Sequence, residues 1–113
     1  MRPELQSLIQ LISNPERFEG KPVRVVAYVV SEFEGDSLYL HQEDYEQALY
    51  KNGLWLADIE KCKDPKGIRI NKRYALVEGT FTAQTRGHRS MWSGTLTVDR
   101  CIASRSTPDQ DRS

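Results

Sequence analysis

The residues with the clearest potential for chemistry lie near the middle of the chain, where His41 is followed by Glu43 and Asp44. An imidazole beside carboxylates can bind a metal ion or work as an acid–base pair. Such a site needs several side chains that converge on one point, and a single imidazole at the expected end of a strand does not provide them. The sequence also has no glycine-rich phosphate loop, nucleophile elbow or helix with paired histidines. We therefore predict no catalytic residues, no metal site and no cofactor, and expect a protein that is not an enzyme.

Cys62 and Cys101 are the other candidates for covalent or metal chemistry. They can form a disulfide if the fold brings them together. The first residues do not read as a secretory signal, and no stretch reaches the about 20 apolar residues of a membrane span. We therefore expect a soluble cytoplasmic protein, in which two cysteines are more often reduced and buried, although the sequence leaves their pairing open. The paired spacing of zinc ribbons is absent.

Acidic residues and tyrosines share one segment, from Ser31 to Tyr50, which contains six acidic residues and no lysine or arginine. Tyrosine is enriched at protein interfaces because it buries a large area at low entropic cost. One hypothesis is therefore a protein-binding face, of the kind that an intracellular inhibitor or a toxin immunity factor offers to a basic enzyme. The alternative is an amphipathic helix with Tyr45 and Leu49 in the core, which needs no partner. The residues of the proposed face are Tyr39, Glu43, Asp44, Tyr45, Glu46 and Tyr50.

The elements that position these residues begin with two predicted helices. Leu5, Leu8, Ile9 and Ile12 fall on one face of a helix that starts near Pro3. The segment 14–20 then has the asparagine, proline and terminal glycine of a single helical turn, with Phe18 as its apolar anchor.

Alternating apolar residues predict five strands, at about 22–33, 38–41, 54–59, 73–82 and 93–102. A short helix is expected between 42 and 52, and a long polar connection between 60 and 71. Gly79 interrupts a bulky run, which is typical of a bulge or a sharp bend where a sheet curls on itself. The sequence therefore predicts one mainly β domain at residues 1–102 and a disordered tail at 103–113.

The stretch from Gly20 to Ile102 resembles the oligonucleotide/oligosaccharide-binding (OB) fold, a five-stranded Greek-key barrel. The resemblance rests on the segments GKPVRV at 20–25, LWL at 54–56 and YALVEGTF at 74–81. It differs from the usual OB pattern because the inserted helix lies between the second and third strands instead of the third and fourth. The chain is also similar to a group of small, uncharacterised bacterial proteins that share FEGK, LYLH, EDY, NGLW and VEGTF, a similarity that implies no established activity.

Basic residues suggest a second function for such a barrel. Six of them, with Asp64 as the only acid, occupy residues 61–73, and His88 and two arginines stand at a later loop tip. OB-like barrels bind single strands with basic side chains beside stacking aromatic rings. The chain as a whole has 16 basic and 16 acidic residues, so it lacks the positive field that favours nucleic acid. Protein binding is thus our first prediction, and single-stranded nucleic-acid binding is the alternative, with Lys63, Lys66, Arg69, Arg86, Arg89 and Trp92 as its residues. A further alternative is that the acidic and basic segments simply face each other.

Overall fold

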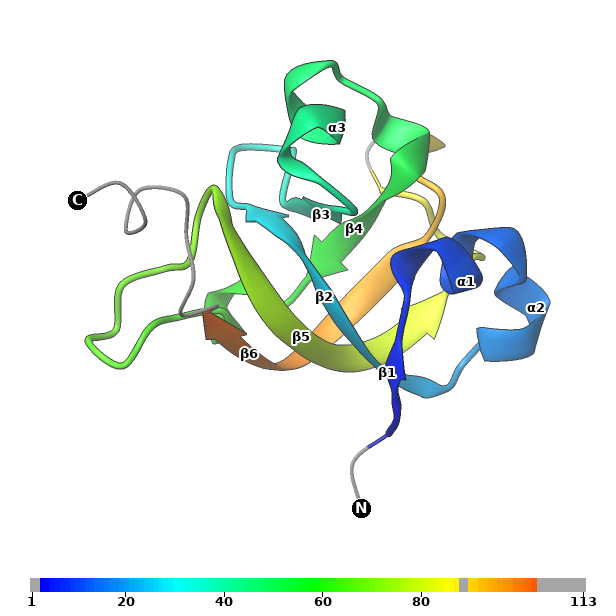
Figure 1. Cartoon of the computed structure of the whole chain (residues 1–113), viewed down its shortest axis with the longest axis horizontal. Helices are drawn as coiled ribbons and strands as arrows, with labels where there is room; N and C mark the ends of the chain where they lie inside the picture. Colours follow the sequence, from blue (N-terminus) through cyan, green and yellow to red (C-terminus); the bar gives the residue numbers. More distant parts are fainter. Residues whose placement is uncertain (1–2, 88–89, 104–113) are drawn as a thin grey trace.

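Five strands curl into a closed barrel in this computed structural model, which describes residues 3–87 and 90–103 (Figure 1). The strands are β2 (Pro22–Val30), β3 (Ser37–Tyr39), β4 (Gly53–Ala57), β5 (Arg73–Thr82) and β6 (Thr95–Ala103). Strands β2, β3 and β4 pair antiparallel in sequence order, and β5 returns to lie beside β2, which is a Greek key. Strand β6 closes the barrel between β5 and β4. The predicted mainly β, OB-like barrel is therefore confirmed.

Alternate residues of each strand point into the barrel and form one core. In β2 these are Val23, Val25, Ala27 and Val29, all buried. The intervening residues of β2 point outward, because side chains alternate along a strand. The outward positions therefore decide what the surface of the barrel presents to other molecules.

Gly79 lies at the predicted irregularity. The pairing of β5 with β6 shifts register between Glu78 and Gly79, which confirms the predicted bulge. A methyl group at this glycine would overlap the carbonyl oxygen of Thr97 on β6. The close approach of the two backbones therefore requires glycine here.

The N-terminus differs from the prediction. Leu5 and Gln6 form a short strand, β1 (Leu5–Gln6), which pairs parallel with β2, and the helix α1 (Leu8–Ser13) begins only after it. The helix starts here because Ser7 caps it: the Ser7 side chain accepts from the Ile9 N–H, and the Gln10 side chain accepts from the Ser7 N–H. As a result Leu8 is buried, while Leu5 and Ile9 are exposed.

The next helical turn, α2 (Pro15–Phe18), forms as predicted, with Phe18 buried. The predicted inserted helix also forms between β3 and β4, but in two pieces, α3 (Gln42–Glu46) and the 3-10 turn η1 (Tyr50–Asn52). Between β4 and β5, where OB folds usually place a helix, there is only the 3-10 turn η2 (Ile59–Lys61).

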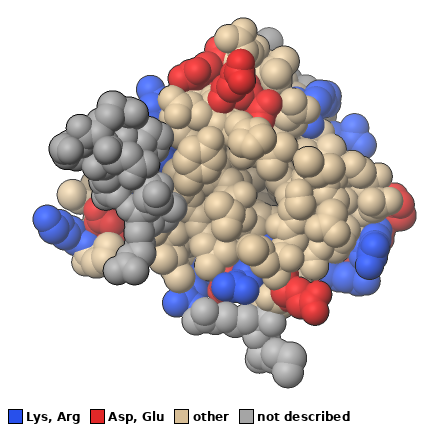
Figure 2. All heavy atoms as spheres, viewed as in Figure 1, with Lys and Arg blue, Asp and Glu red and all other residues tan. Residues whose placement is uncertain are grey.

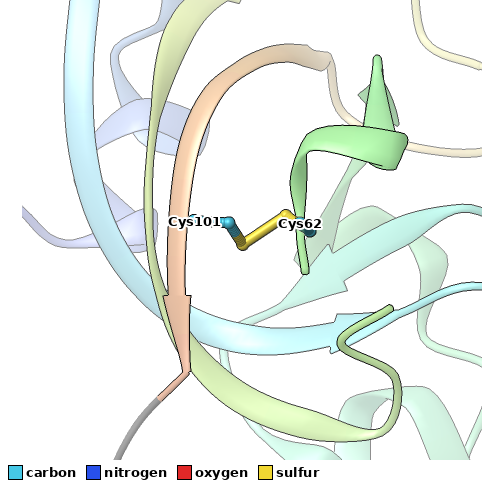
Figure 3. The surroundings of a disulfide bond; sticks show 2 residues. All are labelled: Cys62 and Cys101. Carbon is cyan, nitrogen blue, oxygen red and sulfur yellow. A yellow bond between two sulfur atoms is a disulfide. The ribbon is translucent and has the colours of Figure 1, made fainter. Parts of the chain in front are cut away.

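The two cysteines are joined, which corrects the expectation that they are reduced. Cys62 directly follows η2, and a disulfide links it to Cys101 on β6 (Figure 3). The two Cα atoms are 4.8 Å apart, within the range of bridged cysteines. Cys62 is part of the barrel core together with Ile59 of η2 and Ile70. The disulfide thus ties the connection between β4 and β5 to the barrel wall.

Strand β6 extends to Ala103, one residue beyond the predicted end of the domain, and the rest of the predicted tail, residues 104–113, lies outside the described part of the chain. Within the described part, no helix combines the length and the apolar character that crossing a membrane requires.

Candidate protein-binding surface

An aromatic cluster covers the outside of the barrel beneath α3. It contains all five tyrosines and both tryptophans of the chain. Tyr28 of β2 packs against Tyr74 of β5, with ring centroids 5.2 Å apart, and against Tyr45 of α3 at 6.2 Å. The hydroxyl of Tyr74 also accepts from the backbone N–H of Gln42, at 2.9 Å. These contacts fasten α3 to the barrel wall.

The same cluster fills the surface on which OB folds usually bind ligands, the outer face of the second and third barrel strands. In this chain those strands are β3 and β4. Tyr39 of β3 and Trp92 are 1% and 2% exposed, and the Trp92 Nε1 donates to the Tyr39 hydroxyl at 3.0 Å. Trp55 of β4 packs on Trp92 with centroids 5.0 Å apart. The protein's own side chains thus occupy this face.

The predicted protein-binding residues differ in their exposure and in their contacts within the chain. Tyr39 is buried, so it cannot contact a partner, and its place in the predicted face is corrected. Asp44 is used within the chain, because its carboxylate accepts from the His41 N–H at 2.9 Å and from Asn52 Nδ2 at 3.1 Å. The His41–Asp44 stretch is therefore a helix start, where a carboxylate stabilises an unpaired backbone N–H.

Besides Asp44, which is half-buried, four residues of the predicted face remain accessible. Glu43 and Glu46 are exposed on α3, while Tyr45 and Tyr50 are half-buried. Figure 2 shows acidic side chains gathered over α3 at one end of the molecule. An acidic surface is therefore present, but its tyrosines are mainly part of the packing beneath it.

The pKa of the Tyr45 hydroxyl is raised strongly. Burial and the hydrogen bond from its hydroxyl to the Glu32 carboxylate, 2.9 Å long, raise the pKa of Tyr45 to about 12. Both the low polarity around the ring and the nearby carboxylate disfavour the tyrosinate. The hydroxyl therefore stays protonated and anchors α3 to the connection between β2 and β3.

This raised pKa predicts a loss of stability at alkaline pH. The folded chain keeps the Tyr45 proton between about pH 10, the usual tyrosine pKa, and about pH 12, whereas the unfolded chain releases it. The free energy of unfolding should therefore decrease as pH rises through this window. Denaturant unfolding of Tyr45→Phe across the same range should show a smaller decrease than the wild type. An equal decrease in both proteins would contradict the assignment.

The predicted nucleic-acid residues do not form one site. Lys63, Lys66 and Arg69 are exposed on the connection between β4 and β5, and Arg86 is exposed on the connection between β5 and β6. Arg89 lies outside the described residues. Trp92 is buried, so it cannot stack on a base, and that part of the prediction is corrected.

The basic connection folds back on the acidic segment. Arg69 donates from Nη1 to the Ser31 hydroxyl at 3.2 Å, and the Lys72 Nζ lies 5.8 Å from the centre of the Tyr45 ring. The backbone N–H of Ser31 also donates to the Asn71 side chain at 2.8 Å. The two charged segments therefore lie against each other, as the alternative that they face each other expects. Across residues 3–87 and 90–103, no group of three histidine, cysteine or carboxylate side chains could bind a metal ion.

An exposed apolar surface is the feature that sequence reasoning missed. We call it the apolar face and define it by residues of β1, α1, β2 and β5 and by Leu40, which follows β3. Leu5, Ile9 and Val26 on it are 58%, 56% and 49% exposed. Figure 2 shows this side of the molecule without charge across its centre and with charged side chains along the rim. The residues of the apolar face are Leu5, Ile9, Ile12, Val26, Leu40 and Leu76.

Two shallow depressions run along the apolar face and share Leu8 and Leu40 in their walls. A third, between η1 and the connection of β5 to β6, continues from Asn52 towards Leu49 and Met91. One signal in the sequence could have revealed this surface. Val26 stands at an outward position of a strand whose inward positions are already apolar. Its side chain therefore lies outside the barrel core, where an apolar residue indicates an apolar surface.

Comparison with known proteins supports the fold. One component in the crystal structure of the S. pombe Stn1–Ten1 complex has the same fold, with a TM-score of 0.56. The likeness is one of fold alone. The two sequences are 12% identical, and the match covers 99% of this chain and 86% of the other. No family model matches the sequence, and a search of the curated proteins found no match.

Proposed function

We propose that this protein is a non-enzymatic binding module that recognises a protein partner through its apolar face. The observation that carries the proposal is the exposure of three large apolar side chains, Leu5, Ile9 and Val26, on one uncharged surface. Contiguous apolar patches on soluble proteins commonly mark interaction sites, because their burial on binding is favourable. The structural neighbour is also part of a complex of two proteins.

The acidic residues on α3 indicate which partners this surface favours. Glu43 and Glu46 lie at the rim, where charges guide a partner and select it more than they add affinity. A partner with basic residues around an apolar centre fits this arrangement. Inhibition of a basic enzyme, as by a toxin immunity factor, is the narrower form of the proposal.

Binding of single-stranded nucleic acid is the alternative function. The exposed basic side chains Lys63, Lys66, Arg69 and Arg86 and the frequent use of OB-like barrels for this task support it. The burial of Trp92 and Tyr39 counts against it, because stacking on bases needs exposed rings.

A pull-down with the tagged full chain from native lysate, with and without nuclease, tests these two functions. We expect a nuclease-resistant protein partner, identified by mass spectrometry. Ile9→Lys should reduce its recovery by about tenfold or more, because a charge would be buried without a counter-charge.

The matched control is Ile68→Lys, because Ile68 is 62% exposed on the connection between β4 and β5, outside the apolar face. This variant should recover as much partner as the wild type. Equal recovery by the wild type and Ile9→Lys would exclude the apolar face as the binding site. Recovery of nucleic acid alone would favour the alternative function.

A further inference from the structure

We propose that Phe33 is the central contact of a second protein-binding site, where its ring enters an apolar pocket of a partner protein. The inference goes beyond the proposed function, because Phe33 is not part of the apolar face. It rests on the exposure of the ring and on the way the chain holds the loop that carries it.

Phe33 differs from every other aromatic residue of the chain. All ten phenylalanine, tyrosine and tryptophan residues lie in the described part of the chain. Phe33 is 90% exposed, whereas the other nine are buried or half-buried. A single exposed apolar side chain is common on protein surfaces and indicates no function by itself. The structure of the loop supplies the second observation.

The loop that carries Phe33 is the connection between β2 and β3, residues 31–36, and it forms a tight turn. The Gly35 N–H donates to the Glu32 carbonyl oxygen at 2.9 Å. The Glu32 N–H donates to the Asp36 carboxylate at 3.0 Å. Phe33 therefore stands in the middle of a hydrogen-bonded turn, with its ring in solvent.

Three other parts of the chain brace this turn. The Asn71 side chain, on the connection between β4 and β5, accepts from the Ser31 N–H at 2.8 Å. The Tyr45 hydroxyl of α3 donates to the Glu32 carboxylate at 2.9 Å. The carbonyl oxygen of the last residue in the turn accepts from the Leu56 N–H of β4, at 2.9 Å. A loop that is fixed in this way before binding loses little conformational freedom when it binds.

The backbone of Glu34 shows that the turn is held in a strained conformation. Its φ is 54°, in the left-handed region that residues with a side chain rarely adopt. Such a conformation persists only where the surrounding structure enforces it, and conformations of this kind cluster at active sites, ligand clamps and switches. The chain thus keeps backbone strain next to a ring that it leaves out of its own core.

The charges around the ring favour a protein as its occupant. Both neighbours of Phe33 in the chain, Glu32 and Glu34, are exposed glutamates. Arg69 and Lys72 contact the first residue of the turn and α3. The turn therefore offers no excess of positive charge to the phosphates of nucleic acid or of an anionic membrane. An apolar protein pocket needs no such excess, and aromatic rings in pockets are typical central contacts of protein interfaces.

Site-specific photo-crosslinking in the native cells tests this site. The photoreactive analogue p-benzoylphenylalanine takes the place of Phe33 in the tagged full chain. Ultraviolet light should then join the chain to one protein, seen as a single band of higher mass and identified by mass spectrometry. The same analogue at Glu16 is the control, because Glu16 is exposed on α2, beside the start of β2, whereas the turn follows its end (Figure 1). A missing band at position 33, the same band at position 16, or a band that nuclease removes would overturn the proposal.

The crosslinked protein, once purified, gives the quantitative test. Phe33→Ala should weaken its binding to the chain by about tenfold or more in titration calorimetry, because a central aromatic contact is lost. Phe33→Leu should recover part of this loss, because it restores apolar volume. Binding of Phe33→Ala that equals the wild type would overturn the role of the ring.

Asn71→Ala tests the brace separately from the ring. It should weaken binding by a few-fold, because the turn becomes freer while Phe33 is unchanged. Unchanged binding would overturn the role assigned to the braced turn.

Ile9→Lys separates this site from the apolar face. This variant should leave the crosslink at position 33 as strong as in the wild type. If the crosslink were lost in Ile9→Lys, one partner would cover both surfaces, and the second site would be overturned while the proposed function stands. A crosslink that persists, together with unchanged recovery of all partners by Ile9→Lys, would overturn the apolar face and leave the Phe33 site standing.

Discussion

Replacing Cys62 and Cys101 by alanine should lower the free energy of unfolding by about 4 kcal/mol. The disulfide joins residues 39 positions apart, and a cross-link over a loop of this length removes about that much conformational freedom from the unfolded chain. The bond also holds η2 and the connection from β4 to β5 against β6 (Figure 3). Denaturant unfolding of the oxidised wild type and the double alanine variant measures the difference.

The reduced wild type is the control that isolates the cross-link, because it keeps both sulfur atoms in the core. It should unfold at nearly the same denaturant concentration as the double alanine variant and well below the oxidised wild type. The small remaining difference would reflect the lost volume of the two buried sulfurs. Identical unfolding of the oxidised and reduced wild type would show that the two cysteines are not joined.

The disulfide also illustrates what the sequence could not predict. Cys62 lies in a polar connection and Cys101 in the last strand, and no local pattern relates them. Only the closure of the barrel brings their Cα atoms to 4.8 Å. The expected cytoplasmic location favoured reduced cysteines, but the geometry of the fold decides whether Cys62 and Cys101 pair.

Features that depend on neighbouring residues were predictable. The alternation from Val23 to Val29 predicted β2, and Gly79 predicted the bulge. The asparagine and proline before Phe18 predicted α2. In each case the cause lies within a few residues of its effect, so a local reading of the sequence was enough.

Features that depend on distant partners were missed. The helix α1 starts late because Leu5 and Gln6 find pairing partners in β2, about twenty residues away, and Ser7 then caps the helix. The apolar face was missed for a similar reason. Its side chains come from separate segments that meet only when β1, α1 and β2 lie side by side.

The sequence predicted the types of residue at the candidate site but not which of them are exposed. The acidic stretch does form an exposed surface on α3, but a count of tyrosines could not show which of them face solvent. Tyr39 is buried because it packs in the aromatic cluster with Trp92, 53 residues later in the chain, which also donates a hydrogen bond to it. The residue types indicated which contacts each side chain can make. The long-range fold decides which of these side chains make their contacts within the chain and which stay exposed to a partner.

Trp92→Ala should lower the free energy of unfolding by about 3–5 kcal/mol, the usual cost of removing a large buried aromatic ring. The ring packs edge-on against Tyr50 and Trp55, with centroids 5.3 and 5.0 Å away. Its removal would also leave the buried Tyr39 hydroxyl without its donor. Trp92→Phe should cost less, because it keeps most of the packing and loses only the hydrogen bond and part of the ring. Denaturant unfolding of the three proteins gives the comparison.

This prediction decides between a structural and a nucleic-acid role for Trp92. A tryptophan that stacks on bases is exposed in the free protein, and its loss changes stability by no more than about 0.5 kcal/mol while it weakens nucleic-acid binding. Phe33→Ala is the control for an exposed ring, because Phe33 is 90% exposed, and it should stay within that limit. If Trp92→Ala were as stable as Phe33→Ala, the aromatic cluster would not support the barrel wall, and the ligand face of the OB fold would be open to bases. A large loss for Trp92→Ala alone would mean that the chain uses this face to hold α3, which leaves the apolar face and the acidic rim for binding.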